Sequence, residues 1–197
     1  PMAKVFLSYR RSDSPGYAGR IYDRLANDLG SDSVFFDVDS IDIGDDFLNT
    51  IERAITASKI FIPIIGRDWL NITDESGCRR IDNPQDPVRF EIASALERNL
   101  RIIRVLVANA RMPSELELPE TIAMLARRNA ITVSDVRFHS DVNRLLVAVR
   151  KIFESQPDSF EPADTETSRL GETRLNAADA QAEKPRIDNP PFITQFM

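Results

Sequence analysis

The sequence has 197 residues, 42% of them hydrophobic, and a formal net charge of −6. This length predicts one domain with a real core, or two small domains, and the negative charge argues against a nucleic-acid-binding surface. The chain has one cysteine, Cys78, and one histidine, His139, which excludes an internal disulfide and a cysteine-rich metal site and gives no support to a histidine-based catalytic triad.

Apolar segments typical of strands alternate with amphipathic helical segments from residue 4 to about residue 154. The predicted strands are 4–8, 33–37, 59–65, 101–107 and 130–133. The predicted helices are 17–29, 45–57, 86–99, 120–128 and 140–153. Such alternation indicates right-handed βαβ units around a parallel sheet. We therefore expect an α/β fold, a flavodoxin-like five-stranded parallel sheet flanked by helices, with a strand order that the sequence does not reveal.

Residues 155–197 have a different composition, with eight acidic and four basic residues and no sustained helical or strand period. This composition predicts a disordered acidic, proline-containing tail or a linker. Its apolar end, 190–197, is open to three interpretations: a frayed terminus, a segment that docks on the domain, or the start of a further domain. No apolar run approaches the roughly 20 residues of a membrane span, and no signal peptide precedes the first strand. We expect a cytoplasmic protein without a membrane partner.

Polar residues follow the first predicted strand, in the order Ser8, Tyr9, Arg10, Arg11. Open α/β sheets bind ligands just beyond the carboxyl ends of their strands. Two adjacent arginines at such a place suit a phosphate group, because a guanidinium grips anions with a planar fork of donors. The alternative is a solvated arginine pair that makes surface salt bridges.

A second polar motif lies about eighty residues later, where Asp86 and Pro87 form a good helix start. Four apolar residues of this helix share the face that must pack on the sheet: Val88, Ile92, Ala95 and Leu96. Glu91 falls on the flank of that face, whereas Glu97 points to solvent. We expect Glu91 to be partly buried at the rim of a cleft; the alternative is a surface salt bridge with Arg89 or Arg98.

Three segments, residues 5–11, 37–47 and 86–92, together resemble the TIR (Toll/interleukin-1 receptor) domain family. The similarity extends over residues 4 to about 154, and it is closest to bacterial TIR domains and to an animal TIR enzyme that cleaves NAD⁺. The resemblance implies a five-stranded parallel sheet. It also implies one of two functions, scaffolding through TIR–TIR association or cleavage of NAD⁺ with release of nicotinamide, and it gives the role of catalytic carboxylate to Glu91.

Cleavage of the nicotinamide–ribose bond makes modest demands on a site. The leaving group is a cationic pyridinium that departs as neutral nicotinamide, so it needs no general acid. One carboxylate can stabilise the oxocarbenium-like transition state. No Gly-x-Gly-x-x-Gly follows the first strand, so NAD⁺ is expected as a consumed substrate, with neither a bound cofactor nor a metal.

The resemblance suggests further site residues. Arg10 and Arg11 are candidates for the pyrophosphate. Tyr9 and Trp69 are candidates for stacking on the nicotinamide or adenine ring, although either residue could instead be a core aromatic. The loop after the second strand would border the site with Asp39 and Ser40.

The same loop would contact a neighbouring TIR domain through four residues: Ile41, Asp42, Ile43 and Gly44. Ile43 and Gly44 stand where many TIR domains have Pro-Gly, and Pro87 stands where the animal enzyme has an aromatic residue. A loop that docks on a different surface of its neighbour makes a head-to-tail assembly.

We therefore expect a bacterial-type TIR NAD⁺ glycohydrolase that is activated by self-association. The product would be open-chain or cyclic ADP-ribose, and the setting would be defence or toxicity, with a fused or separate sensor domain as a possible partner. The alternative is a catalytically silent TIR interaction module, including a mimic of host adaptors. A response regulator of the same fold class is disfavoured, because Ile65 and Gly66 end the third strand where a phosphoacceptor aspartate would be required.

Overall fold

The computed structural model describes residues 5–36 and 47–155. These ranges hold one parallel sheet, made of β1 (Val5–Ser8), β2 (Val34–Phe36), β3 (Ile60–Ile65), β4 (Arg101–Ile102), β5 (Arg104–Val107) and β6 (Ala130–Val133). The strands follow the order β2-β1-β3-β5-β6, and β4 pairs with β3. This order is that of flavodoxin-like sheets, which confirms the predicted fold class. It also places the first strand of the chain between two neighbours.

The segment predicted as one strand, 101–107, is divided into β4 and β5 at Ile103. Both pieces pair with β3: Phe61 is opposite Ile102, and Ile64 is opposite Val105. By the same register Ile103 lies opposite Ile62, next to Pro63, which has no backbone N–H to donate to the neighbouring strand. The proline therefore explains why one predicted strand becomes two.

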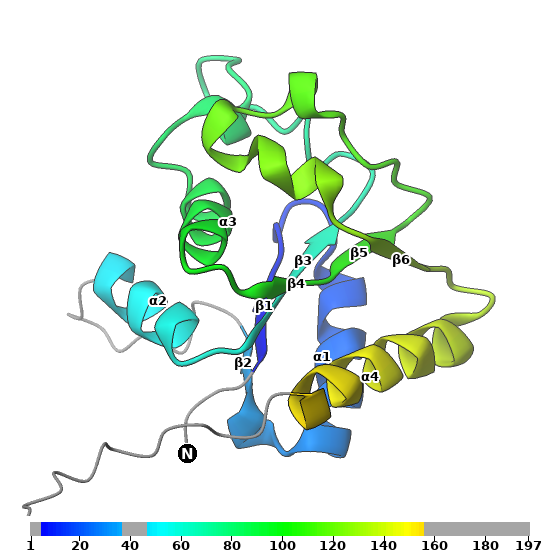
Figure 1. Cartoon of the computed structure of the whole chain (residues 1–197). Coiled ribbons are helices and arrows are strands. Elements are labelled where there is room, and N and C mark those ends of the chain that lie inside the picture. Colours follow the sequence, from blue (N-terminus) through cyan, green and yellow to red (C-terminus); the bar gives the residue numbers. More distant parts are fainter. Residues whose placement is uncertain (1–4, 37–46, 156–197) are drawn as a thin grey trace, which may run out of the picture. The chain divides into compact units, whose positions relative to one another are not determined.

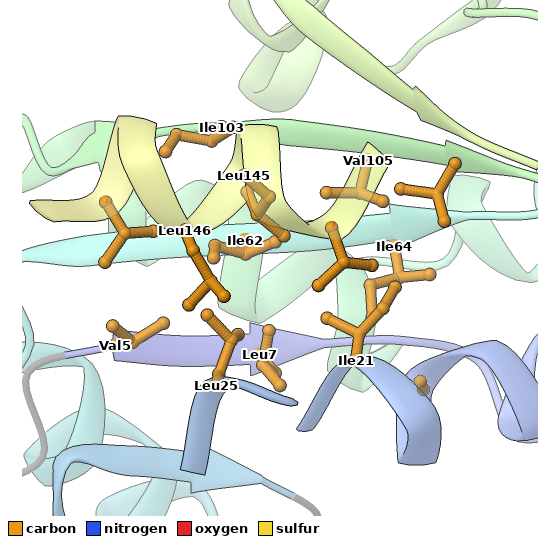
Figure 2. Packing of buried hydrophobic residues seen from close by; sticks show 14 of the residues in the cluster. Val5, Leu7, Ile21, Leu25, Ile62, Ile64, Ile103, Val105, Leu145 and Leu146 are labelled. Atoms are coloured by element: carbon orange, nitrogen blue, oxygen red, sulfur yellow. The ribbon is translucent and has the colours of Figure 1, made fainter. Parts of the chain in front are cut away.

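Helices cover both faces of the sheet (Figure 1). On one face, α1 (Pro15–Leu29) and α4 (Phe138–Ser155) pack on side chains of β1, β3 and β5, and Figure 2 shows this cluster around Leu7, Ile62 and Val105. On the other face, α2 (Phe47–Thr56) and α3 (Pro87–Glu97) pack on Phe6 and Phe61. Because all six residues of β3 are buried, the central strand is covered on both sides, as its sequence predicts.

The segment predicted as a helix over 120–128 is the 3-10 helix η5 (Glu120–Arg127). Its two buried residues, Ile122 and Leu125, are three positions apart. A 3-10 helix has three residues per turn, so this spacing puts both side chains on the face toward the core. The other described 3-10 helices are short: η1 (Ser31–Ser33), η3 (Arg80–Asp82) and η4 (Glu115–Glu117). Beyond Ser155, the predicted tail lies outside the described residues.

Candidate functional site

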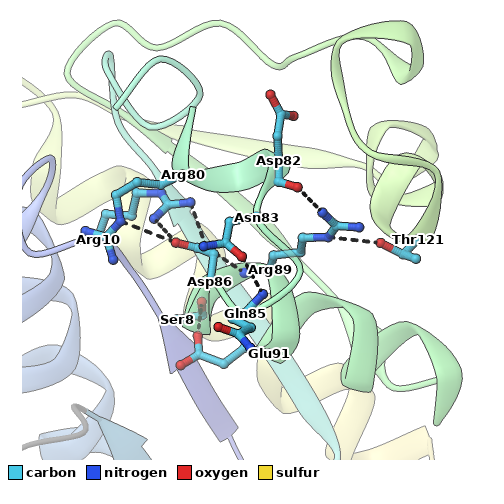
Figure 3. Close-up of polar contacts among 10 residues, drawn as sticks. All are labelled: Ser8, Arg10, Arg80, Asp82, Asn83, Gln85, Asp86, Arg89, Glu91 and Thr121. Atoms are coloured by element: carbon cyan, nitrogen blue, oxygen red, sulfur yellow. Dashed lines mark hydrogen bonds and ion pairs between the residues drawn. The ribbon is translucent and has the colours of Figure 1, made fainter. Parts of the chain in front are cut away.

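The last residue of β1 meets the third α-helix at the carboxyl edge of the sheet. The Oγ of Ser8 donates a hydrogen bond of 2.6 Å to Oε2 of Glu91 (Figure 3). Both residues are buried, with 2% of Ser8 and 4% of Glu91 exposed to solvent. A hydroxyl donor fixes the orientation of a carboxylate and stabilises its ionised form. The structure therefore brings two residues that are 83 positions apart into one polar contact.

Helix α3 begins where the sequence predicts. Asp86 is its N-cap, and the Asp86 carboxylate accepts a hydrogen bond from the backbone N–H of Arg89, while Pro87 occupies the first turn. Val88 and Ile92 are buried against the sheet, and Glu97 is exposed. Glu91 is buried more deeply than a residue at the rim of a cleft, because the flank of α3 on which it lies faces the end of β1.

Arg10 forms a buried, two-pronged ion pair with the same N-cap residue. Its two terminal nitrogens each donate to one carboxylate oxygen of Asp86 over 2.9 Å. The side chain of Arg10 is 2% exposed and that of Asp86 is 1% exposed. The pyrophosphate contact predicted for Arg10 stays a prediction; in this structure both terminal nitrogens of its guanidinium bind Asp86. Arg10 thus connects β1 to the start of α3.

A second arginine reaches Asp86 from the outside. The Nε of Arg80, in η3, lies 3.4 Å from Oδ2 of Asp86, and the Arg80 side chain is 41% exposed. Figure 3 shows Arg10 and Arg80 side by side at this carboxylate, with Ser8 and Glu91 beyond it. Asp86 therefore neutralises one fully buried arginine and also contacts one that remains accessible to solvent.

Trp69 belongs to the core rather than to an open surface. It is 1% exposed and packs in the cluster that also contains Phe6 and Ile92. The guanidinium of Arg10 lies over its ring, 5.6 Å from the ring centroid. The position of Trp69 agrees with the alternative of a core aromatic, because the protein itself covers the indole, and stacking on a substrate ring stays a prediction.

Comparison with known proteins identifies the family. A family model described as a TIR domain matches residues 5–146. The chain belongs to the TIR family. A Drosophila melanogaster protein named NAD(+) hydrolase sarm1 is 31% identical to this TIR domain over 127 residues, which are 64% of the chain and 9% of that relative.

A solved structure supports the fold of this TIR domain. The TIR domains in the structure of the activated Roq1 resistosome that recognises the effector XopQ match it with a TM-score of 0.55. The match covers 75% of this chain and 99% of the other chain, at 12% sequence identity, so it shows the fold alone. Over residues 5–36 and 47–155, no helix has the length and the apolar character needed to cross a lipid bilayer.

The remaining predicted site residues of the TIR domain lie in different settings. Tyr9 is half-buried and stacks on Phe36, with ring centroids 5.2 Å apart. Arg11 is exposed in the loop after β1, where a phosphate contact stays a prediction. Six residues of the loop after β2 lie outside the described residues: Asp39, Ser40, Ile41, Asp42, Ile43 and Gly44.

Sequence reasoning missed a second contact at this edge. The two carboxylate oxygens of Asp13 accept hydrogen bonds from the backbone N–H groups of Gly66 and Asp68 over 2.8 Å and 2.9 Å. This contact connects the loop after β1 to the loop after β3. A side chain at Gly66 would collide with it, since an added Cβ would lie 2.3 Å from Oδ2 of Asp13. In the sequence, the one indication of a close contact at this position is Gly66 itself, a glycine directly after a buried strand.

The roles of Ser8, Arg80 and the Arg10–Asp86 pair were also missed, because each depends on a partner far away in the sequence. Ser8 donates to the buried carboxylate of Glu91, whereas Arg10 and Arg80 both contact Asp86, at the start of the same helix. Within the described ranges, no group of three or more His, Cys, Asp or Glu side chains is placed to hold a metal ion. The arrangement is suited to stabilising positive charge at Glu91 and negative charge at the arginine side of the site.

Proposed function

We propose that this TIR domain is an NAD⁺ glycohydrolase that releases nicotinamide when it self-associates. The observation that carries the proposal is the hydrogen bond from Ser8 to Glu91 at the carboxyl edge of the sheet. The name of the relative, NAD(+) hydrolase, supports the same substrate. A role in bacterial defence or as a toxin, a cytoplasmic setting and an attached sensor domain remain predictions from the sequence.

The chemistry asks for one well-placed carboxylate. As the nicotinamide–ribose bond breaks, positive charge moves from the pyridinium ring to the ribose, and neutral nicotinamide leaves. Glu91 would stabilise the charge on the ribose and orient one of its hydroxyls or the attacking water. Ser8 would hold the carboxylate in place, so that no energy is spent on reorienting it as the bond breaks. The C1′–N bond breaks with its electron pair remaining on the nicotinamide nitrogen. C1′ then bonds to the oxygen of water, which gives up a proton to solvent, or to another atom of the ADP-ribose product.

Self-association is part of the proposal because Glu91 is only 4% exposed. A substrate that reaches this carboxylate needs a local rearrangement of the residues around it. A second TIR domain that docks next to the site would supply the free energy for such a rearrangement, since a partner shifts an equilibrium by its preference for one state. An isolated domain is then expected to be weakly active.

The test is nicotinamide release from NAD⁺ by purified protein. Glu91→Gln should lower kcat by about 100- to 1000-fold, because one electrostatic stabiliser of the transition state is lost. Glu97→Gln, an exposed residue on the same helix, is the matched control and should keep full activity. Full activity in Glu91→Gln, or equal loss in both variants, would show that Glu91 is not the catalytic residue.

The assembly part of the proposal predicts that specific activity rises with protein concentration. Replacing Ile43 or Gly44 should lower both assembly, measured by light scattering, and activity, while the thermal midpoint stays unchanged. Constant specific activity from nanomolar to high micromolar protein, with a monomer throughout, would rule out activation by self-association.

A second candidate function is a catalytically silent TIR interaction module. The burial of Glu91 favours it, because a buried glutamate with a hydroxyl donor is also a stable structural pair. One result distinguishes the two candidate functions. If artificially clustered wild-type protein releases no nicotinamide at any concentration, the interaction module is the better description.

A further inference from the structure

We propose that Arg80 is the residue that binds the diphosphate of the dinucleotide, in place of Arg10. This inference rests on the proposed function, since it assigns the anionic part of the substrate to a side chain of the same site. The sequence suggests Arg10 and Arg11, which follow β1, as candidates for binding the pyrophosphate. The structure points instead to an arginine of η3, on the loop that leads into α3.

The first argument is that Arg10 and Arg80 contact the carboxylate of Asp86 in different ways. Its carboxylate is 1% exposed and carries one negative charge for two guanidinium groups. Arg10, at 2% exposure, takes both oxygens through two hydrogen bonds of 2.9 Å. Arg80 approaches only Oδ2, through Nε at 3.4 Å, and 41% of its side chain is exposed. Both arginines contact Asp86, but only the guanidinium of Arg80 is exposed enough for a ligand to reach it.

The second argument is that the backbone of Arg80 is held firmly. Its N–H donates to the carbonyl of Ile72 over 2.8 Å, and the next residue, Ile81, is completely buried. On the other side of the turn, Arg79 pairs with Asp82 through two hydrogen bonds of 2.8 Å. A side chain on such an anchored turn loses less conformational entropy when it binds an anion than one on a loose loop.

The third argument is the spacing along α3. Asp86 and Glu91 are five residues apart, which corresponds to ~7.5 Å along a helix axis. In a nicotinamide dinucleotide, the nearer phosphate is joined through one methylene group to the ribose whose C1′ reacts. In the proposed orientation the 5′ side of a ribose at Glu91 faces the Asp86 end of the helix, where Arg80 lies. The positive N-terminal end of α3 favours negative charge in the same place.

The experiment compares Arg80→Gln and Arg80→Lys with wild type in steady-state cleavage of NAD⁺. Arg79→Gln is the matched control, because it removes the neighbouring arginine, whose partner is Asp82. We expect Arg80→Gln to raise KM at least tenfold with kcat within twofold, since a phosphate contact is made in both the ground state and the transition state. Arg80→Lys should lie in between, because lysine keeps the charge and loses the fork. Inorganic pyrophosphate should inhibit wild type competitively and Arg80→Gln at least tenfold more weakly.

Three results would overturn the inference. They are a KM within twofold of wild type in Arg80→Gln, a fall in kcat without a change in KM, or equal inhibition of both proteins by pyrophosphate. Thermal midpoints of all variants identify any loss that comes from unfolding. If wild type releases no nicotinamide, the proposed function fails, and calorimetric binding of ADP-ribose decides. Binding that weakens at least tenfold in Arg80→Gln and not in Arg79→Gln supports the diphosphate site, whereas equal or absent binding overturns it.

Discussion

The buried ion pair between Arg10 and Asp86 makes the stability of this domain sensitive to a single substitution. Asp86→Ala removes the partner of a guanidinium that is 2% exposed and so leaves a buried, unpaired charge. Breaking such a pair costs about 3–5 kcal/mol. The same substitution removes the N-cap of α3, which costs about 1 kcal/mol more. The expected loss of about 4–6 kcal/mol is a large part of the 5–15 kcal/mol that typically stabilises a domain.

The assay is urea unfolding followed by the fluorescence of Trp69, the only tryptophan in the sequence. Trp69 is 1% exposed and lies under the Arg10 guanidinium, so its emission reports on this part of the core directly. A double-mutant cycle separates the charge from the cap. Arg10→Met combined with Asp86→Ser leaves no buried charge and keeps a residue that can cap the helix.

The double variant should therefore be more stable than the sum of its two single losses predicts, by at least about 1 kcal/mol. The reasoning would be refuted in either of two ways. The first is an Asp86→Ala variant that loses less than about 1 kcal/mol, and the second is a cycle that is additive within about 0.5 kcal/mol.

Two further substitutions test features at the same edge of the sheet. Gly66→Ala should destabilise the domain by about 1–3 kcal/mol in urea unfolding, because the new Cβ would lie 2.3 Å from Oδ2 of Asp13. The control Gly16→Ala should not destabilise it, because no atom lies within 4 Å of a Cβ added there. Equal stability of both variants would contradict this packing. The O–H of Tyr17 donates to Asp135, which raises the pKa of Tyr17 above its ordinary value of 10.0, so the stability from this bond is full below pH 10 and is lost as the pH rises through the raised pKa. Thermal midpoints should therefore fall above about pH 10 in wild type and less in Tyr17→Phe, and parallel curves would refute the assignment.

The sequence predicts the elements of this fold well, since their signals are local. Alternating apolar and amphipathic segments identify the strands, and Asp86-Pro87 marks the start of α3 within one residue. The two differences between the predicted and the observed elements also have local causes, but the sequence alone does not show which effect decides the structure. Pro63 breaks a ladder on a neighbouring strand, and the three-residue spacing of Ile122 and Leu125 is compatible with either kind of helix.

The site is less predictable, because its residues take their roles from partners far away in the chain. A sequence motif shows that Arg10 follows a strand, but not that Asp86, 76 residues later, will occupy both of its terminal nitrogens. An indole such as that of Trp69 can either stack on a ligand or fill a core, and only the packing shows that Trp69 lies in the core. Helical periodicity predicts only the flank position of Glu91, and its proposed catalytic role comes from the resemblance to TIR domains. Its partner Ser8 could not be inferred from that helix alone.

The position of β1 between β2 and β3 has a consequence for the protein during its synthesis. Ser8 is made early, but its hydrogen-bond partner Glu91 follows 83 residues later, and β3, which pairs with β1, comes between them. A chain still growing on the ribosome therefore cannot form the Ser8–Glu91 contact until β3 and α3 have emerged. If the domain destroys NAD⁺, this order of events keeps unfinished chains harmless to the cell that makes them.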